Sequence, residues 1–226
     1  MAGRISLTFD DGMDCQLRNA VPALDRRGLP GTFFLCASKE QPEIGEPLLR
    51  DWLDVLPRHE IGSHSVRHLK AATLDAANAD YEARASKQWL KEAFSSPITS
   101  FCYPYTDAPK ILESAVWGAG YKQARGGRVA SPNKYLKRGD GANLLNVTCF
   151  HVGPETVKDQ AKWLSELWKS PDPLWLTLMF HGIGDERKWD NISTEQFEDL
   201  LDAILDITGL RTVTFAEGAE WYRSGK

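Results

Sequence analysis

Short apolar runs rich in β-branched and aromatic residues alternate along the chain with longer segments whose apolar residues recur every three or four positions. This alternation indicates strands joined by amphipathic helices, which is the pattern of parallel βα units. The strands are expected at 4–9, 31–37, 60–63, 98–103, 122–125, 144–151, 175–180 and 211–215. The helices are expected at 14–27, 74–94, 109–119, 154–168 and 194–207. Eight strands in such units predict an α/β fold, a closed or nearly closed (β/α) barrel of seven or eight parallel strands.

The most distinct of these helices is the one expected at 194–207. Ser193 stands where an N-cap is needed and Gln196 occupies the third helical position, which together form a capping box. An apolar stripe follows at helical spacing and is expected to pack on the sheet. Its members are Phe197, Leu200, Leu201, Ile204 and Leu205.

Side chains able to do chemistry gather at the expected carboxyl ends of the strands, where barrel enzymes carry their active sites. They are Asp10 and Asp11 after the first strand, His64 and His68 after the third, Tyr105 after the fourth, Arg125 at the end of the fifth and His181 after the seventh. The glycine-rich stretch 126–143 is expected to form a long loop over the same rim. The sequence therefore predicts a single functional site on one rim.

Composition narrows the class of protein and its partners. The chain has 226 residues, of which 42% are hydrophobic and 26% charged, as in soluble globular proteins, and we expect one catalytic domain over 1–226. The net charge of −4 offers no cationic field, so nucleic acid and membrane surfaces are poor partners and a neutral or cationic substrate fits better. The most apolar run, 174–180, is too short to span a bilayer.

The start of the chain and its cysteines indicate the cellular compartment in which the protein is expected. Residues 1–4 pass directly into a strand without the apolar segment of a secretory signal, so the protein is cytoplasmic if Met1 is native and secreted if a leader has been removed. No C-x-x-C spacing occurs, and free thiols are expected at Cys15, Cys36, Cys102 and Cys149. The sequence indicates no particular oligomeric state.

The combination of an acidic pair with an H-x-x-x-H motif indicates metal chemistry. His64 and His68 lie one turn apart if their segment is helical, and a third ligand such as Asp11 would leave a coordination position open for water. Each piece alone has another interpretation: Asp10-Asp11-Gly12 could be an acidic turn that caps a helix, and the histidines could be surface residues. Together, at one rim, they favour a metal-dependent hydrolase.

Four motifs in this order resemble those of the polysaccharide deacetylases of carbohydrate esterase family 4. They are Thr8-Phe9-Asp10-Asp11-Gly12, His64-Ser65-x-x-His68, Tyr103-Pro104-Tyr105 and Leu178-Met179-Phe180-His181. The resemblance extends from about residue 4 to residue 220. It implies a distorted β/α barrel that removes acetyl groups from N-acetylated poly- or oligosaccharides such as chitin or peptidoglycan, or alternatively from O-acetylated ones.

The resemblance also implies roles for individual residues. Asp11, His64 and His68 would hold a divalent metal, Zn²⁺ or another ion such as Co²⁺. Asp10 would be the general base and His181 the acid that protonates the departing amine. The backbone N–H of Tyr105 would stabilise the oxyanion.

The chain departs from the family pattern in two places. Cys102 stands where the third motif has an arginine that orients the base, and the fourth motif is absent from 124–128. We hypothesise that Arg125 supplies the missing guanidinium from the neighbouring strand; alternatively, it is a surface residue of a glycine-rich loop.

Three further residues have open assignments. Trp189, in the loop after His181, either stacks on a sugar ring or packs within its loop. His151 ends a strand, matches no motif, and is either structural or substrate-facing. His59 precedes a strand and is placed on the opposite face.

Two other functions remain open at this level. The altered motifs allow a hydrolase of a non-sugar or cyclic amide on the same barrel. A carbohydrate-binding protein without turnover is the other alternative, although binding alone requires neither the base nor the acid.

Overall fold

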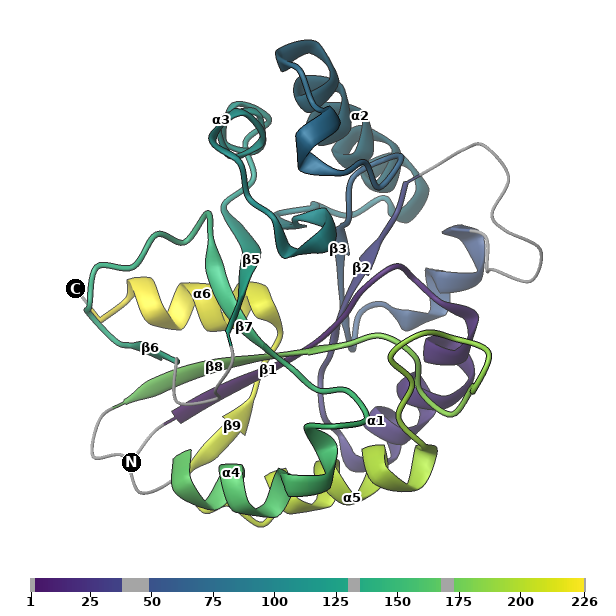
Figure 1. Cartoon of the computed structure of the whole chain (residues 1–226), viewed down its shortest axis with the longest axis vertical. Coiled ribbons are helices and arrows are strands. Elements are labelled where there is room, and N and C mark those ends of the chain that lie inside the picture. Colours follow the sequence, from purple (N-terminus) through teal and green to yellow (C-terminus); the bar gives the residue numbers. More distant parts are fainter. Residues whose placement is uncertain (1–2, 38–48, 130–134, 168–172, 226) are drawn as a thin grey trace.

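The computed structural model describes residues 3–37, 49–129, 135–167 and 173–225. Seven parallel strands form a closed barrel, as predicted (Figure 1). In ring order they are β1 (Gly3–Phe9), β2 (Thr32–Leu35), β3 (Glu60–Ser63), β4 (Ser100–Cys102), β5 (Gln123–Val129), β7 (Val147–His151) and β8 (Leu174–Phe180). The ring closes because β8 pairs with β1 along Arg4–Phe9.

The eighth predicted strand lies outside this ring. β9 (Leu210–Thr212) pairs in parallel with Gly3–Ile5 of β1, whereas β2 pairs only with Thr8 and Phe9 at the other end of β1. Because β1 changes neighbour along its length, the barrel is distorted rather than regular. A short strand that the sequence did not predict, β6 (Leu136–Lys137), runs antiparallel to β8.

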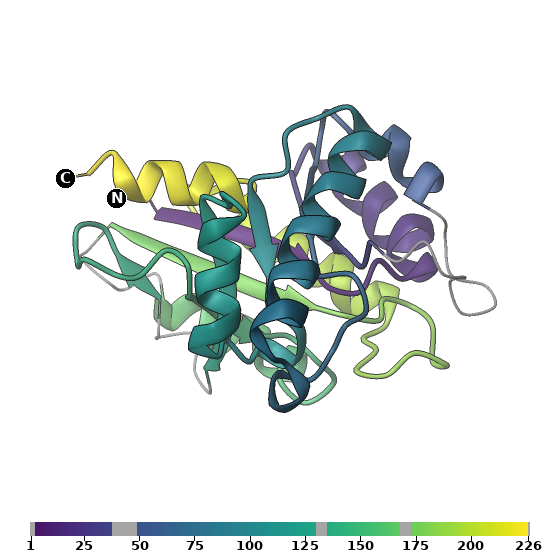
Figure 2. The same ribbon diagram turned by 90° about the horizontal axis from the view of Figure 1, so that it is seen from above.

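Helices surround the barrel (Figures 1 and 2). The α-helices are α1 (Val21–Arg27), α2 (Ala76–Phe94), α3 (Lys110–Gly118), α4 (Gln160–Leu167), α5 (Thr194–Leu205) and α6 (Phe215–Arg223). One π-helical turn (Gln16–Ala20) precedes α1, and 3₁₀ turns span Leu49–Val55, Ala71–Thr73, Pro104–Thr106 and Val157–Asp159. The helix predicted at 154–168 begins later, at Gln160, and its residue 168 lies outside the described residues. Within the described residues, no helix has the length and apolarity needed to cross a bilayer.

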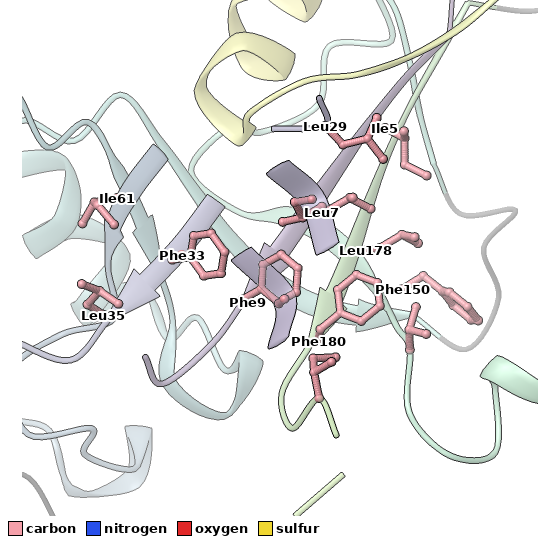
Figure 3. Close-up of a cluster of buried hydrophobic side chains, with 14 of the residues drawn as sticks. Ile5, Leu7, Phe9, Leu29, Phe33, Leu35, Ile61, Phe150, Leu178 and Phe180 are labelled. Atoms are coloured by element: carbon pink, nitrogen blue, oxygen red, sulfur yellow. The ribbon is translucent and has the colours of Figure 1, made fainter. Parts of the chain in front are cut away.

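The main core lies between the outward faces of the strands and the helices. Phe9 stacks between Phe33 and Phe180, with ring centroids 4.7 and 5.2 Å away, so one aromatic row crosses three adjacent strands (Figure 3). Phe197 of α5 meets this row edge-on. Four members of the stripe predicted on 194–207 therefore pack on the sheet, and the capping box of Ser193 and Gln196 is formed. The helix ends at Leu205, which is 50% exposed, so the predicted packing of this residue is wrong.

The inside of the barrel is filled at the amino end of its strands by α6. Phe215 and Tyr222 of this helix join a buried cluster with Phe34 and Trp175 from the strands. The carboxylate of Glu60 accepts a hydrogen bond from the N–H of Ala216 at 2.9 Å, which satisfies a donor in the first turn of α6. Because α6 covers the amino end, the carboxyl end is left for a site. The helix was not predicted: the last predicted strand ends at 215, and residues 216–223 were assigned to no element.

The loop predicted at 126–143 is wrong in its first part. β5 continues to Val129, and its register with β7 shifts between Arg125 and Arg128, which marks a bulge. Gly127 at this bulge has φ 32°, a value that glycine adopts readily. Residues 130–134 lie outside the described residues. Arg125 therefore lies within β5 rather than at its end, and it is fully buried, which excludes the surface alternative.

The four cysteines are free, as expected.

Candidate active site

Three ligand-type side chains from two loops converge at the carboxyl end of the barrel. Asp11 Oδ1 lies 3.3 Å from His64 Nε2 and 3.4 Å from His68 Nε2, and the three donor atoms lie within 4.8 Å of one another. Ligand atoms bound to zinc at about 2.0–2.1 Å in tetrahedral geometry lie about 3.3–3.4 Å apart. One carboxylate and two imidazoles at these separations therefore fit a divalent ion with a further position open.

The two histidines do not lie on a helix, so their four-residue spacing does not bring them together through a helical turn. Residues 64–68 form an irregular turn in which Ser65 and His68 have φ of 67° and 52°, and Asp11 has φ 73°. Left-handed backbone at non-glycine residues is uncommon and gathers at functional sites. The imidazoles therefore meet through a tight turn, in which Ser65 Oγ accepts the N–H of His68 at 3.1 Å.

A buried carboxylate that the sequence did not reveal supports this turn. Glu82 of α2 is 1% exposed, and its Oε2 accepts the N–H groups of Val66 and Arg67 at 2.8 and 2.9 Å. Its Oε1 accepts Nε of Arg67 at 2.7 Å. Glu82 thus fixes the segment between the two histidines from outside the candidate metal site.

The protonation of two of the three ligands, Asp11 and His68, suits a cation. His64 Nδ1 lies 2.9 Å from the carbonyl oxygen of Cys102, so Nδ1–H donates to that oxygen and Nε2 faces Asp11. Burial lowers the pKa of His64, but Cys102 and the hydrogen bond with Asp11 outweigh it and raise the pKa well above 6.5, so a cation would take the place of the Nε2 proton. Burial raises the pKa of Asp11, but the hydrogen bond and charge of His64 outweigh it and bring the pKa to about 2. Burial, followed by the charge of His64, lowers the pKa of His68 to about 4. An anionic oxygen and a neutral imidazole are both ready donors at neutral pH.

Asp10 lies beside one of the three ligands, with a carboxylate oxygen within 4.8 Å of a ring nitrogen of His64, and pairs with a buried arginine. Arg125 Nη2 contacts both carboxylate oxygens of Asp10, and these two side chains are 0% and 3% exposed. Burial raises the pKa of Asp10, but the guanidinium of Arg125, followed by His64, outweighs it and holds the pKa below its ordinary value of 3.8. Asp10 is therefore an ionised carboxylate next to the candidate metal position.

Arg125 lies directly beside the residue that replaces the family's motif arginine. Cys102 of β4 and Arg125 of β5 are register partners, and the guanidinium contacts the thiols of Cys102 and Cys149. The guanidinium thus approaches Asp10 from the adjacent strand, which is the geometry required by the hypothesis that Arg125 compensates for Cys102. Its role in orienting the base stays a prediction.

His181 joins the same site from the end of β8. Its Nε2 lies 3.8 Å from Asp10 Oδ2, and the residue is 5% exposed. The side-chain amide of Gln16 donates to the carbonyl oxygens of both Asp10 and His181, at 2.7 and 3.1 Å. This buried bridge fixes the ends of β1 and β8 relative to each other.

Two exposed aromatic rings lie against the histidines of the site. The ring of Tyr105 is centred 4.6 Å from that of His68, and the ring of Trp189 is centred 3.9 Å from that of His181. More than half of each aromatic residue remains exposed, 54% for Tyr105 and 59% for Trp189. Both rings therefore pack on the site and still present apolar surface to a ligand.

The other two histidines, His59 and His151, lie at opposite ends of the barrel. His59 lies next to Asp25 and the N–H of Gly31, before β2 and β3, at the opposite end of the barrel from the site, as expected. His151 lies at the site, with its ring 5.9 Å from that of His181, and contacts Asp190. Asp190 was not identified from the sequence, because a polar loop residue nine positions after His181 carries no recognisable spacing.

Comparison with known proteins identifies relatives of the chain. A model of the family described as polysaccharide deacetylase matches residues 2–124, just over half of the chain. A chitin deacetylase from Pestalotiopsis sp is 29% identical over 121 residues, which cover 51% of this chain and 39% of that relative. The match thus spans less than half the length of the curated relative.

Solved structures share the fold over nearly the whole chain. A family 4 acetyl xylan esterase from Clostridium thermocellum, in complex with a cobalt ion, has a TM-score of 0.62 and 17% identity, covering 96% of this chain and 91% of that chain. A pseudoenzyme of carbohydrate esterase family 4 from Bacillus anthracis has a TM-score of 0.62 and 13% identity, covering 96% of this chain and 66% of that chain. Since the family match covers more than half of the chain and the fold agrees beyond it, the protein belongs to the polysaccharide deacetylase family.

Proposed function

We propose that the protein is a metal-dependent hydrolase that removes acetyl groups from an acetylated poly- or oligosaccharide. The observation that carries the proposal is the convergence of Asp11, His64 and His68 at ligand distances, with the ionised carboxylate of Asp10 beside them and the imidazole of His181 next to that carboxylate. A bound Zn²⁺ or Co²⁺ would polarise the acyl oxygen and activate a water molecule. Binding alone does not require a base and an acid at such a centre.

Two groups outside the set of three candidate ligands, Asp10 and His181, carry out the proton transfers. Asp10 accepts a proton from the attacking water, since its carboxylate is ionised and held in place by Arg125. Nε2 of His181, on the same side as Asp10, donates a proton to the departing nitrogen or oxygen. The N–H of Tyr105 stabilises the oxyanion of the tetrahedral intermediate. Trp189 and the ring of Tyr105 provide surfaces on which a sugar can stack.

Acetate release from a panel of substrates tests this function. The panel contains N-acetylglucosamine oligomers, acetylated xylan and a cyclic imide, each assayed with protein as purified, treated with chelator, and resupplied with Zn²⁺ or Co²⁺. We expect acetate from at least one glycan, at least about a tenfold loss after chelation, and recovery with metal. Activity that survives complete removal of metal would overturn the mechanism. Imide opening without acetate release, or oligosaccharide binding without turnover of any substrate, would instead favour the cyclic amide hydrolase or the binding protein.

Removal of the Glu82 carboxylate should weaken metal binding without touching a ligand. In Glu82→Ala, the N–H groups of Val66 and Arg67 lose their acceptor, so the turn between His64 and His68 is no longer fixed. Loss of such a supporting group costs about 10–100-fold in metal affinity. Competition of the protein with a chromogenic zinc chelator measures the change.

The matched control is Asp80→Ala, which removes a carboxylate from the same helix. Asp80 pairs with Arg84 on the exposed surface of α2 and should leave zinc affinity unchanged. Equal zinc affinity for Glu82→Ala and the parent protein would show that the turn holds its shape without this carboxylate.

A further inference from the structure

Three buried polar atoms from three segments converge on the far side of His181. His151 Nε2, at the end of β7, His181 Nδ1, after β8, and Asp190 Oδ2, in the loop before α5, lie within 4.8 Å of one another. Both histidines are 5% exposed and the Asp190 side chain is 16% exposed. Asp190 Oδ2 contacts His151 Nε2 and lies 3.5 Å from His181 Nδ1. A carboxylate shared by two buried imidazoles needs an explanation that the three-ligand centre does not provide.

We propose that Asp190 is a positioning residue for His181, and that Arg128 and His151 hold its carboxylate in place. This inference rests on the proposed function, in which Nε2 of His181 donates a proton. Because Nδ1 of His181 faces Asp190, Nδ1 keeps its proton in both the neutral ring and the imidazolium, and Nε2, directed toward Asp10 3.8 Å away, is the nitrogen that takes up a proton from solvent and donates it to the leaving group. The carboxylate therefore determines both the orientation of the ring and the nitrogen that exchanges a proton with substrate.

The contact with Arg128 distinguishes this arrangement from a second metal site. A guanidinium only donates hydrogen bonds, and Arg128 Nη2 contacts His151 Nδ1, so Nδ1 must be the acceptor. The proton of neutral His151 is then on Nε2, where it is donated to Asp190. An imidazole with Nε2–H has no lone pair there for a cation. The geometry consequently favours a chain of hydrogen bonds from Arg128 through His151 and Asp190 to His181.

The charge of Asp190 agrees with that chain. Burial raises the pKa of the Asp190 carboxyl, but hydrogen bonds from His151 and His181 outweigh it, so the pKa lies well below its usual range. The carboxylate is thus ionised and can accept from both imidazoles.

The backbone conformation at Asp190 and the glycine at 153 permit the contact between Asp190 and His151. Asp190 has φ 57°, and its loop is closed by the bridge between Ile183 and Ile192, with Gly184 N–H donating to the Ile192 carbonyl at 2.8 Å. A Cβ on Gly153 would lie 2.5 Å from Asp190 Oδ1 and 2.7 Å from the ring of His151. The absence of a side chain at 153 therefore allows the carboxylate and the imidazole to meet.

The test compares Asp190→Asn with Glu186→Gln, a control that neutralises an exposed carboxylate of the same loop. We expect kcat of Asp190→Asn to fall about 10–100-fold with KM nearly unchanged, because the ring is no longer held. The control should retain the parent kcat. Asp190→Glu, which restores the charge, should recover part of the loss. Gly153→Ala provides a second variant and should reproduce the loss by displacing Asp190.

Imidazole ¹⁵N chemical shifts provide a readout that does not depend on turnover. In the parent protein His181 should be in the Nδ1–H form, and Asp190→Asn should mix the two tautomers. Unchanged shifts and kcat in Asp190→Asn would overturn the proposal, as would binding of two zinc ions per chain with loss of one in this variant. A parent protein that releases no acetate but shows the tautomer change would contradict the proposed function alone.

Discussion

Arg125→Met is expected to lower the free energy of unfolding by about 3–5 kcal/mol, because it leaves the Asp10 carboxylate buried without its partner. Methionine fills much of the same volume, so the loss reflects the unpaired charge rather than a cavity. Turnover should fall by about 10–100-fold, since the general base loses the group that orients it. Urea unfolding followed by circular dichroism measures the first effect, and acetate release the second.

The pH dependence of the free energy of unfolding tests whether the loss in Arg125→Met comes from the unpaired charge of Asp10. In the parent protein the pKa of Asp10 is below 3.8, so the ionised carboxylate stabilises the fold above about pH 4, and this contribution is lost as the pH falls through the lowered pKa. In Arg125→Met, burial is no longer offset by the guanidinium, so the pKa of Asp10 rises. The folded variant then binds more protons than its unfolded state above about pH 4. Its deficit in stability should therefore be larger at pH 8 than at pH 5.

Two variants separate the charge from the shape of Arg125. Arg125→Lys keeps the charge but not the planar guanidinium, and it should recover part of the stability and little of the turnover. The double variant Arg125→Met with Asp10→Asn removes both charges and should be more stable than Arg125→Met alone. If Arg125→Met matched the parent protein in turnover and in both pH profiles, the proposed compensation for Cys102 would be wrong.

The order of strands and helices was readable from the sequence because each strand is a short apolar run and each helix has its own periodicity. The run 175–180, buried on both faces, and the capped helix that begins after Ser193 are examples. The number of strands in the ring could not be predicted from the sequence. Whether 211–215 closes the barrel depends on which half of β1 it pairs with, and no local pattern specifies that register.

The site was readable to the extent that its residues follow strands. The parallel strands deliver Asp10, Asp11, His64 and His181 to one rim, so their proximity follows from topology alone. The supporting groups were not readable in the same way. Glu82 lies within α2, and its position resembles any buried helical site until the turn that it supports is seen. Asp190 depends on the path of a closed loop, which spacing along the chain does not reveal.

Asp10→Asn and Asp11→Asn should have different consequences although the residues are neighbours. In Asp10→Asn the three ligands are intact, so the protein should still bind one divalent ion per chain, whereas kcat should fall about 10²–10⁴-fold through loss of the base. In Asp11→Asn the anionic ligand is lost, so both bound metal and turnover should fall. Metal content by plasma emission after gel filtration, together with acetate release, measures both quantities.

A carboxylate at the other end of the barrel provides the control. Asp25 pairs with Arg58 and His59 away from the site, so Asp25→Asn should retain both metal and turnover. Asp10→Asn also leaves Arg125 buried without its carboxylate, so unfolding curves must show that the variant is folded at the assay temperature. If Asp10→Asn lost its metal while Asp11→Asn kept it, the two roles would have to be exchanged. If both variants retained full turnover, neither carboxylate would take part in the reaction, because a base and an anionic ligand cannot both be replaced by neutral amides without effect.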